Sequence, residues 1–86
     1  MPAYTVSFAR SAWKEFSRLE VALASRILEK IEALVSDPRP AGCRKLEGSD
    51  DFWRIRVGEY RVIYSIDDSH HVVDISAIRH RSDAYR

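Results

Sequence analysis

The sequence has few of the features that mark disulfide-bonded, membrane-spanning or secreted proteins. It contains one cysteine, Cys43, and this excludes an internal disulfide framework. It has no run of about 18 apolar residues, so no segment is a candidate transmembrane helix. Its first residues lack the basic stretch and apolar stretch of a secretory signal peptide. These absences together predict a cytoplasmic protein.

The motifs of several enzyme classes are also missing. There is no glycine-rich phosphate loop, no Ser-His-Asp constellation and no C-x-x-C pair. The adjacent pair His70 and His71 makes a poor metal site, because structural metal sites use more ligands than two. We therefore expect no metal and no small-molecule cofactor. The net charge is only +1, from 14 basic and 13 acidic residues, so any nucleic-acid site must come from a local patch of basic side chains.

The length and composition fit one small domain spanning residues 1–86. The chain has 86 residues, of which 45% are hydrophobic, and chains this short rarely support two cores. Alternating apolar residues predict a strand over Tyr4–Phe8. Apolar residues at spacings of three and four then predict one helix over Ala9–Leu19 and a second over Glu20–Ser36. The second helix must stop at Asp37-Pro38, because the residue before a proline disfavours helix.

Three strands are predicted in the second half of the chain. They follow a loop over residues 39–51 and span Phe52–Val57, Tyr60–Ile66 and Val72–Arg79. Gly58-Glu59 suits a two-residue hairpin turn with glycine first. Short turns join the strands, which predicts an antiparallel meander. The fold class is therefore α+β, with a helical hairpin packed on one face of the sheet.

Strand alternation predicts which side chains face the helices. On the first strand of the hairpin, Trp53, Ile55 and Val57 share the core face, and Arg54 and Arg56 project from the other. The turn then sets Arg56 opposite Arg61, a mildly unfavourable pairing of the kind expected at a binding site. On the last strand, strict alternation groups Arg79 with Val73, Ile75 and Ala77. Both tryptophans, Trp13 and Trp53, are predicted to lie in the core.

Basic residues are concentrated in the last third of the chain. The hairpin carries three arginines against one glutamate, and the segment 78–86 holds three more arginines with His80 and Tyr85. Guanidinium groups recognise phosphate through a planar, permanently charged fork. The pattern predicts a phosphate-binding surface that could hold and cleave RNA without a metal. The competing interpretation is an ordinary solvated sheet face.

Four segments resemble the RelE/ParE superfamily of toxins from type II toxin–antitoxin pairs: Lys45–Gly48, Trp53–Val57, Tyr60–Tyr64 and Arg79–Tyr85. The C-terminal arginine and tyrosine pattern is similar to the RelE branch, whose members cleave mRNA in the ribosomal A site. The resemblance implies a ribosome-dependent endoribonuclease (an mRNA interferase) that inhibits translation, with the ribosome, mRNA and a cognate antitoxin as partners. A ParE-like DNA gyrase inhibitor without nuclease activity remains open, as does a catalytically degenerate toxin.

The same resemblance implies the site residues. Residues that bind RNA are expected to be Lys45, Arg54, Arg56 and Arg81. Catalytic residues are expected to be Arg61, Arg79, His80 and Tyr85. Attack of the 2′-hydroxyl on phosphorus needs a base, a group that stabilises phosphoryl charge and a group that neutralises the leaving oxygen. Tyr85 and His80 both remain candidates for the base.

Overall fold

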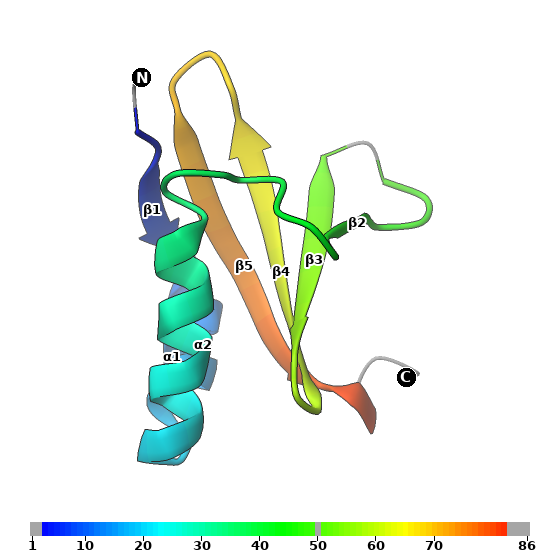
Figure 1. Cartoon of the computed structure of the whole chain (residues 1–86). Helices are drawn as coiled ribbons and strands as arrows, with labels where there is room; N and C mark the ends of the chain where they lie inside the picture. Colours follow the sequence, from blue (N-terminus) through cyan, green and yellow to red (C-terminus); the bar gives the residue numbers. More distant parts are fainter. Residues whose placement is uncertain (1–2, 50, 83–86) are drawn as a thin grey trace.

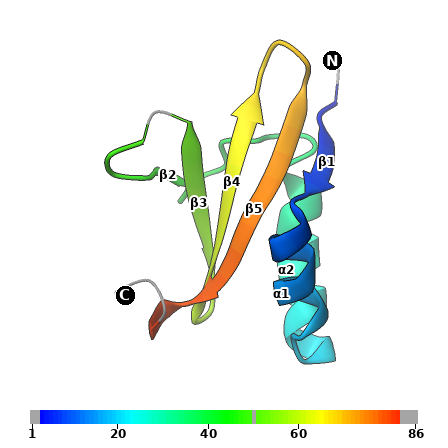
Figure 2. The ribbon, with the colours of Figure 1, turned by 180° about the vertical axis from the view of Figure 1, so that it is seen from behind.

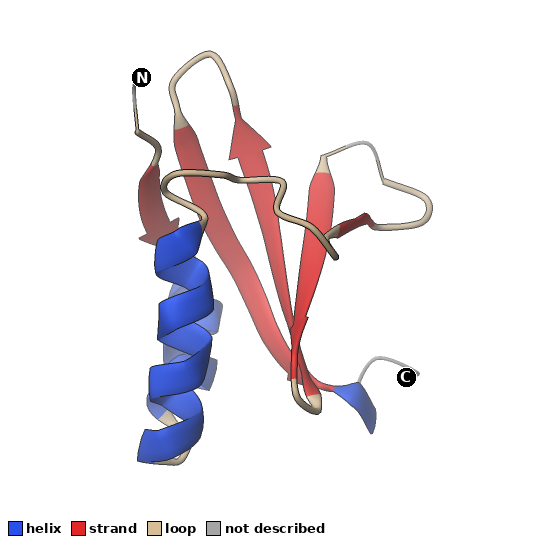
Figure 3. Cartoon of the chain, viewed as in Figure 1, coloured by secondary structure: helices blue, strands red, loops and turns tan. Residues whose placement is uncertain are grey.

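The computed structural model describes residues 3–49 and 51–82, which form two helices and a five-stranded sheet (Figure 1). Figure 3 colours the same view by type of element. The α+β class and the order of the predicted elements are confirmed. The elements along the chain are β1 (Thr5–Phe8), α1 (Arg10–Ser17), α2 (Val21–Ala33), β2 (Arg44–Lys45), β3 (Phe52–Val57), β4 (Tyr60–Asp67) and β5 (Val72–His80).

The helical hairpin breaks where the sequence predicts, near Leu19-Glu20, although neither glycine nor proline marks the position. Glu20 has extended backbone angles and precedes α2 directly. The second helix is shorter than predicted and ends at Ala33. Its last turn tightens, because the amide groups of Leu34 and Val35 bond to carbonyls three residues back instead of four. Those bonds satisfy the carbonyl groups of Ile31 and Glu32 before the chain reaches Pro38.

The sheet has the strand order β1-β5-β4-β3-β2. The β3–β4 and β4–β5 pairs are antiparallel, which confirms the predicted meander. Gly58 has a φ of 58°, a left-handed conformation that glycine adopts without steric cost. Two features lie beyond the predictions: β1 pairs in parallel with β5, and residues 44–45 of the expected loop form a short strand beside β3.

The core lies between the helices and one face of the sheet, and Figures 1 and 2 show the helical layer from its two sides. Its fully buried side chains come from both layers: Ala12, Ile27, Ile31, Leu34, Val62, Tyr64, Val73 and Ile75. No helix of the described residues is long and apolar enough to cross a membrane.

The prediction that Trp13 lies in the core is wrong, because the residue is 55% exposed. Ala12 occupies the inward position of α1, and the next residue is therefore turned towards the margin of the helix layer. There the Trp13 ring stacks on Phe16 and meets Phe8 edge-on. Trp53, by contrast, packs against the core while Arg39 lies over its ring at 5.1 Å from the centroid.

Candidate nucleic-acid interface

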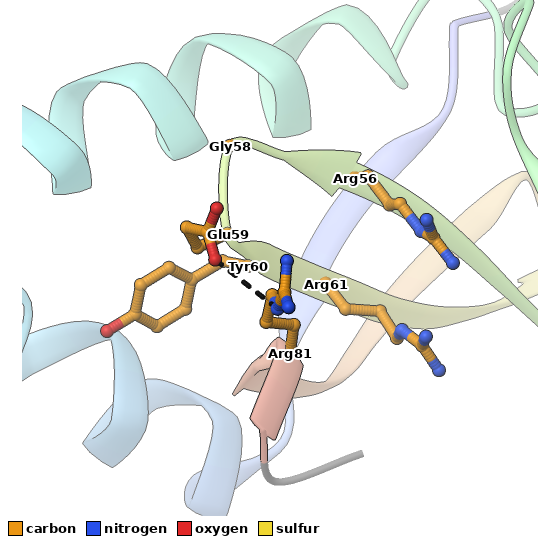
Figure 4. A pocket seen from close by; sticks show the side chains of 6 residues that line it. All are labelled: Arg56, Gly58, Glu59, Tyr60, Arg61 and Arg81. Atoms are coloured by element: carbon orange, nitrogen blue, oxygen red, sulfur yellow. Dashed lines mark ion pairs between the residues drawn. The ribbon is translucent and has the colours of Figure 1, made fainter. Parts of the chain in front are cut away.

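Three arginines stand in one row across three neighbouring strands. Arg56 on β3 pairs in register with Arg61 on β4, and Arg61 pairs in turn with Arg79 on β5. Residues paired directly across antiparallel strands share a face. Figure 4 shows the Arg56 and Arg61 side chains extending in the same direction. The neighbouring row points the opposite way into the core and consists of Ile55, Val62 and Ile78.

A bulge in β5 brings Arg79 into this row. Tyr64 pairs with Ile75 but the preceding Ile63 pairs with Ala77, so Ser76 has no partner on β4. One extra residue reverses the alternation for everything that follows it. Strict alternation would have grouped Arg79 with buried Val73 and Ile75. The bulge instead buries Ile78 and exposes Arg79, which corrects the grouping expected from the sequence.

Arg54 extends the basic surface along β3. Its pairing partner on β2 is Arg44, a residue that sequence reasoning did not select. Partial burial lowers the pKa of Arg54, and the nearby charges of Arg56, Arg61 and Arg44 lower it further. A bound anion would offset this repulsion and stabilise the charged form of Arg54. Lys45 pairs with Trp53 and therefore lies on the opposite face from Arg54, with its ammonium 5.7 Å from the centre of the Trp53 ring.

A hollow of about 240 Å³ lies at the turn end of the arginine row. Arg81 closes one side of it, held by a 2.7 Å hydrogen bond from its backbone N–H to the carbonyl of Glu59. The Arg81 Nε is also 3.5 Å from a Glu59 carboxylate oxygen (Figure 4). The residues that line the hollow are Arg56, Gly58, Glu59, Tyr60, Arg61 and Arg81.

Arg79 differs from its neighbours in having a carboxylate partner from the helical layer. Its Nε lies 2.8 Å from Oε2 of Glu15 on α1. The other oxygen of Glu15 accepts a 2.9 Å hydrogen bond from the backbone N–H of Ile78. One carboxylate therefore anchors both the backbone and the guanidinium at the end of β5. Glu15 carries no signal in the sequence, because it is one acidic residue on an amphipathic helix.

The two candidates for the base are in different positions relative to the row. His80 pairs with Tyr60 and meets its ring edge-on at 5.2 Å between centroids. It therefore lies on the face opposite Arg61 and Arg79. Its Nδ1 accepts from the backbone N–H of Ser82 at 3.2 Å. Tyr85 lies outside the described residues.

Most guanidinium groups of this basic surface have no carboxylate partner among the described residues. Within residues 3–49 and 51–82, no carboxylate comes within 4.0 Å of the guanidinium of Arg54, Arg56 or Arg61. No group of three or more His, Cys, Asp or Glu side chains in the same ranges is arranged to hold a metal. The arrangement is suited to binding an extended anion, because several permanently charged guanidinium groups lie on the same face of the sheet.

Comparison with known families gives one match that spans most of the chain. Residues 6–85 match the family described as the ParE toxin of the type II toxin–antitoxin system parDE. Among curated proteins, toxin RelE of Mycobacterium tuberculosis is 33% identical over 84 residues, covering 96% of this chain and 87% of the relative. Toxin RelG of the same organism is 33% identical over 87 residues, covering 96% of this chain and 97% of the relative.

Solved structures give the same result for the fold. A chain of the archaeal RelE–RelB complex from Pyrococcus horikoshii OT3 superposes with a TM-score of 0.81 at 34% identity, covering 94% of this chain and 97% of that one. The isolated Escherichia coli RelE toxin also gives a TM-score of 0.81, at 25% identity, with 96% of both chains covered.

Proposed function

The chain belongs to the RelE/ParE superfamily of type II toxin–antitoxin toxins, and on this premise we propose that it is a ribosome-dependent endoribonuclease. In this proposal the toxin acts in the cytoplasm, cleaves mRNA in the A site and is neutralised by a cognate antitoxin. The observation that carries the proposal is the row of Arg56, Arg61 and Arg79 on one face of the sheet. The names of the RelE relatives support it.

In the proposed chemistry, side chains of the chain and water carry out each step. A base takes the proton of the RNA 2′-hydroxyl, the 2′-oxygen forms a bond to the adjacent phosphorus, and the bond from phosphorus to the 5′-oxygen breaks. The leaving 5′-oxygen takes a proton from water, and the products are a 2′,3′-cyclic phosphate and a 5′-hydroxyl. Arg79 stabilises the charge that grows on the phosphoryl oxygens, and Arg61 neutralises the leaving oxygen. Arg54, Arg56 and Arg81 hold the RNA backbone.

Tyr85 is the base in this mechanism. The role is assigned by resemblance to the RelE branch. A tyrosine has an ordinary pKa near 10, and guanidinium groups that came close to it in the complex with RNA would favour the phenolate form. The position of His80, on the face of β5 opposite Arg79, makes it the less suitable of the two candidates.

An antitoxin is the protein partner in this proposal. Structures of relatives contain such partners: the Pyrococcus horikoshii toxin is in complex with RelB, and an E. coli RelE variant is in complex with an antitoxin RelBc peptide. An antitoxin that lays acidic side chains across the arginine row would both neutralise charge and block RNA.

The experiment that tests the nuclease maps new 5′ ends on a translated mRNA by primer extension after the protein is induced. We expect in-frame cuts that disappear when translation is blocked. Arg61→Ala, Arg79→Ala and Tyr85→Phe should each lower cleavage by about 100-fold or more, as loss of a catalytic group does. His80→Phe keeps an aromatic ring against Tyr60 and should cleave within about threefold of wild type. Cleavage by Tyr85→Phe at the wild-type rate would refute the assignment of the base.

A second candidate function is inhibition of DNA gyrase without nuclease activity. It is favoured by the family match, whose description names a ParE toxin. Purified protein and purified gyrase distinguish the two candidates. Blocked supercoiling together with intact mRNA would establish the gyrase inhibitor, whereas cut mRNA and normal supercoiling would establish the nuclease. Intact mRNA, normal supercoiling and normal growth would indicate a degenerate toxin.

A further inference from the structure

A second basic hollow lies where α2 passes the β3–β4 hairpin, and Arg56 is the one residue that it shares with the proposed nuclease site. It encloses about 270 Å³ and is lined by Arg26, Glu29, Lys30, Arg56, Val57 and Gly58. A neighbouring hollow of about 340 Å³ is lined by Lys30, Arg54 and Arg56 among others. Arg56 also lines the hollow on the arginine face. It therefore connects the row on the sheet with the basic side chains of the helix.

The edge of β3 leaves this region open. In the part of the chain that the structure describes, β2 pairs with Trp53 and Arg54 only. No described strand pairs with residues 55–57 on the side away from β4. The helix passes close to this edge: Nη2 of Arg26 lies 3.4 Å from the position that a Cβ on Gly58 would occupy.

The helical period presents Arg26 and Lys30 together. The two residues are four apart and are thus neighbours on one side of α2. The residues directly after them, Ile27 and Ile31, are buried in the core. The two basic side chains therefore emerge at the border between the buried stripe of α2 and solvent, beside the open edge of β3.

The charges in this region are not neutralised by ion pairs. Among the described residues, neither Arg26 nor Lys30 has a carboxylate within 4.0 Å, in contrast to Arg79 and Arg81. Glu29 lines the hollow and offsets part of the charge. The local excess remains positive, because one carboxylate faces Arg26, Lys30 and Arg56.

We propose that Arg26, Lys30 and Arg56 form a second binding site, which holds the phosphodiester backbone of RNA as it leaves the arginine row around the edge of β3. The inference rests on the proposed function, because continuity with the row is what identifies RNA as the ligand. Arginine and lysine side chains bind the phosphates of the RNA backbone, and recognition of bases would need an aromatic side chain on which the bases stack. The RNA is either the flanking part of the message or ribosomal RNA, since both present the same phosphates.

The test measures binding of a fluorescent, fully 2′-O-methylated single-stranded RNA by anisotropy over a range of salt concentrations. The modification prevents attack by the 2′-oxygen, so the measurement reports binding alone. The double variant Arg26→Gln/Lys30→Gln should lose two phosphate contacts. The slope of log K against log salt should then become shallower by about 1.4, at about 0.7 per phosphate. This corresponds to an affinity lower by up to about 25-fold near 0.1 M salt.

The chain offers a matched control on its other helix. Arg10 and Lys14 of α1 are also an exposed arginine and lysine four residues apart, and they line none of these hollows. Arg10→Gln/Lys14→Gln changes the net charge equally and should leave the salt slope unchanged. Glu29→Gln should raise the affinity. Thermal unfolding of each variant verifies that the proteins compared are folded.

A parallel measurement of cosedimentation with purified ribosomes separates the two sources of RNA. If Arg26→Gln/Lys30→Gln weakens binding of the oligonucleotide, the ligand of the second site is the message. If it weakens ribosome binding alone, the ligand is ribosomal RNA. Both results support the site. Equal losses in the two double variants would overturn it, and so would no loss in either assay. Unchanged RNA and ribosome binding with weaker antitoxin binding would assign the surface to an acidic peptide and would also overturn it.

Failure of this inference and failure of the nuclease give different results. If the wild-type protein leaves translated mRNA intact, the nuclease fails even if the α2 variants lose RNA affinity. If the wild-type protein cleaves mRNA, Arg61→Ala and Tyr85→Phe do not, and the α2 variants bind RNA normally, the second site alone fails.

Discussion

At the scale of single residues, carboxylate partners separate the arginines of the site into two kinds. Arg54, Arg56 and Arg61 have none within 4.0 Å among the described residues, whereas Arg79 is held by Glu15 at 2.8 Å. An ion pair at Nε uses one of the five N–H donors of a guanidinium. The group is thereby oriented and retains donors for a phosphate. Glu15 is thus a positioning residue for Arg79.

Glu15→Gln tests this role. The substitution preserves the length of the side chain and an oxygen that accepts from Ile78, but it removes the charge that orients Arg79. The pair is partly exposed, so its contribution is at most about 1 kcal/mol. We expect the single-turnover rate of cleavage on programmed ribosomes to fall roughly fivefold, with little change in thermal stability.

A double-mutant cycle distinguishes positioning from general weakening of the structure. In an Arg79→Ala background, Glu15→Gln should have no further effect on the rate, because the group that it orients is absent. An equal loss of rate in both backgrounds would contradict the assignment.

At the scale of elements, the end of β5 shows how one residue decides which side chains reach the site. The unpaired Ser76 reverses the alternation, so that Ile78 points into the core and Arg79 points out. The strand itself was predictable from its apolar and β-branched residues. The bulge was not, because Ile75, Ala77 and Ile78 give no preference between the two alternations.

A second connection between elements lies at the other end of the sheet. Asp68, in the turn after β4, accepts a 2.6 Å hydrogen bond from the hydroxyl of Tyr4. Arg39, in the loop after α2, donates to the same carboxylate at 2.9 Å. These contacts tie the start of the chain and the loop to the β4–β5 turn. The Arg39 guanidinium, and then the Tyr4 hydroxyl, lower the pKa of Asp68 below its ordinary value of 3.8.

This shift predicts a pH-dependent effect of Asp68→Asn on stability. A carboxyl group whose pKa is lowered by folding stabilises the folded state above its unfolded pKa and loses that effect as the pH falls through the folded pKa. The variant should therefore have a lower urea midpoint than wild type at pH 7. The difference should shrink as the pH falls below about 3.8.

Urea unfolding monitored by tryptophan fluorescence at several pH values measures this effect. Glu32→Gln on α2 serves as the control, because the Glu32 side chain makes no ion pair in the described ranges. A difference between Asp68→Asn and wild type that stays constant down to about pH 2 would contradict the assigned cause.

At the scale of the whole molecule, the buried Tyr64 joins the sheet to the segment that follows the helices. Its ring is fully buried, and its hydroxyl donates a 2.8 Å hydrogen bond to the carbonyl of Pro38. Burial raises the pKa of Tyr64, so the hydroxyl keeps its proton. This bond satisfies a carbonyl at the place where the chain leaves α2 and turns back towards the sheet.

Tyr64→Phe should lower the free energy of unfolding by about 1 kcal/mol, the typical loss for one hydrogen bond. For a domain of this size the melting temperature should fall by about 4–8 °C. Thermal unfolding measured by circular dichroism tests this. Tyr60→Phe is the matched control, because the Tyr60 hydroxyl makes no hydrogen bond to the described residues, and its melting temperature should stay close to that of wild type.

Much of the fold was predictable because local patterns and packing agree. The helical hairpin, the three-stranded meander and the opposition of Arg56 and Arg61 follow from apolar periodicity and from the Gly58-Glu59 turn. The exceptions have definite causes. Trp13 has the spacing of a core residue but lies at the edge of the helix layer, and residues 44–45 form a strand only because Trp53 and Arg54 offer an open edge.

The class of the fold, the register of the β3–β4 hairpin and the shared face of its arginines follow from the amino-acid sequence alone, because each depends on residues that are close along the chain. The parallel pairing of β1 with β5 and the contact of Glu15 with Arg79 arise from the packing of distant segments in the folded chain. The approach of α2 to the open edge of β3 arises in the same way. Each of these contacts joins residues far apart in the sequence, and their geometry depends on how the helices pack on the sheet, which no local pattern specifies.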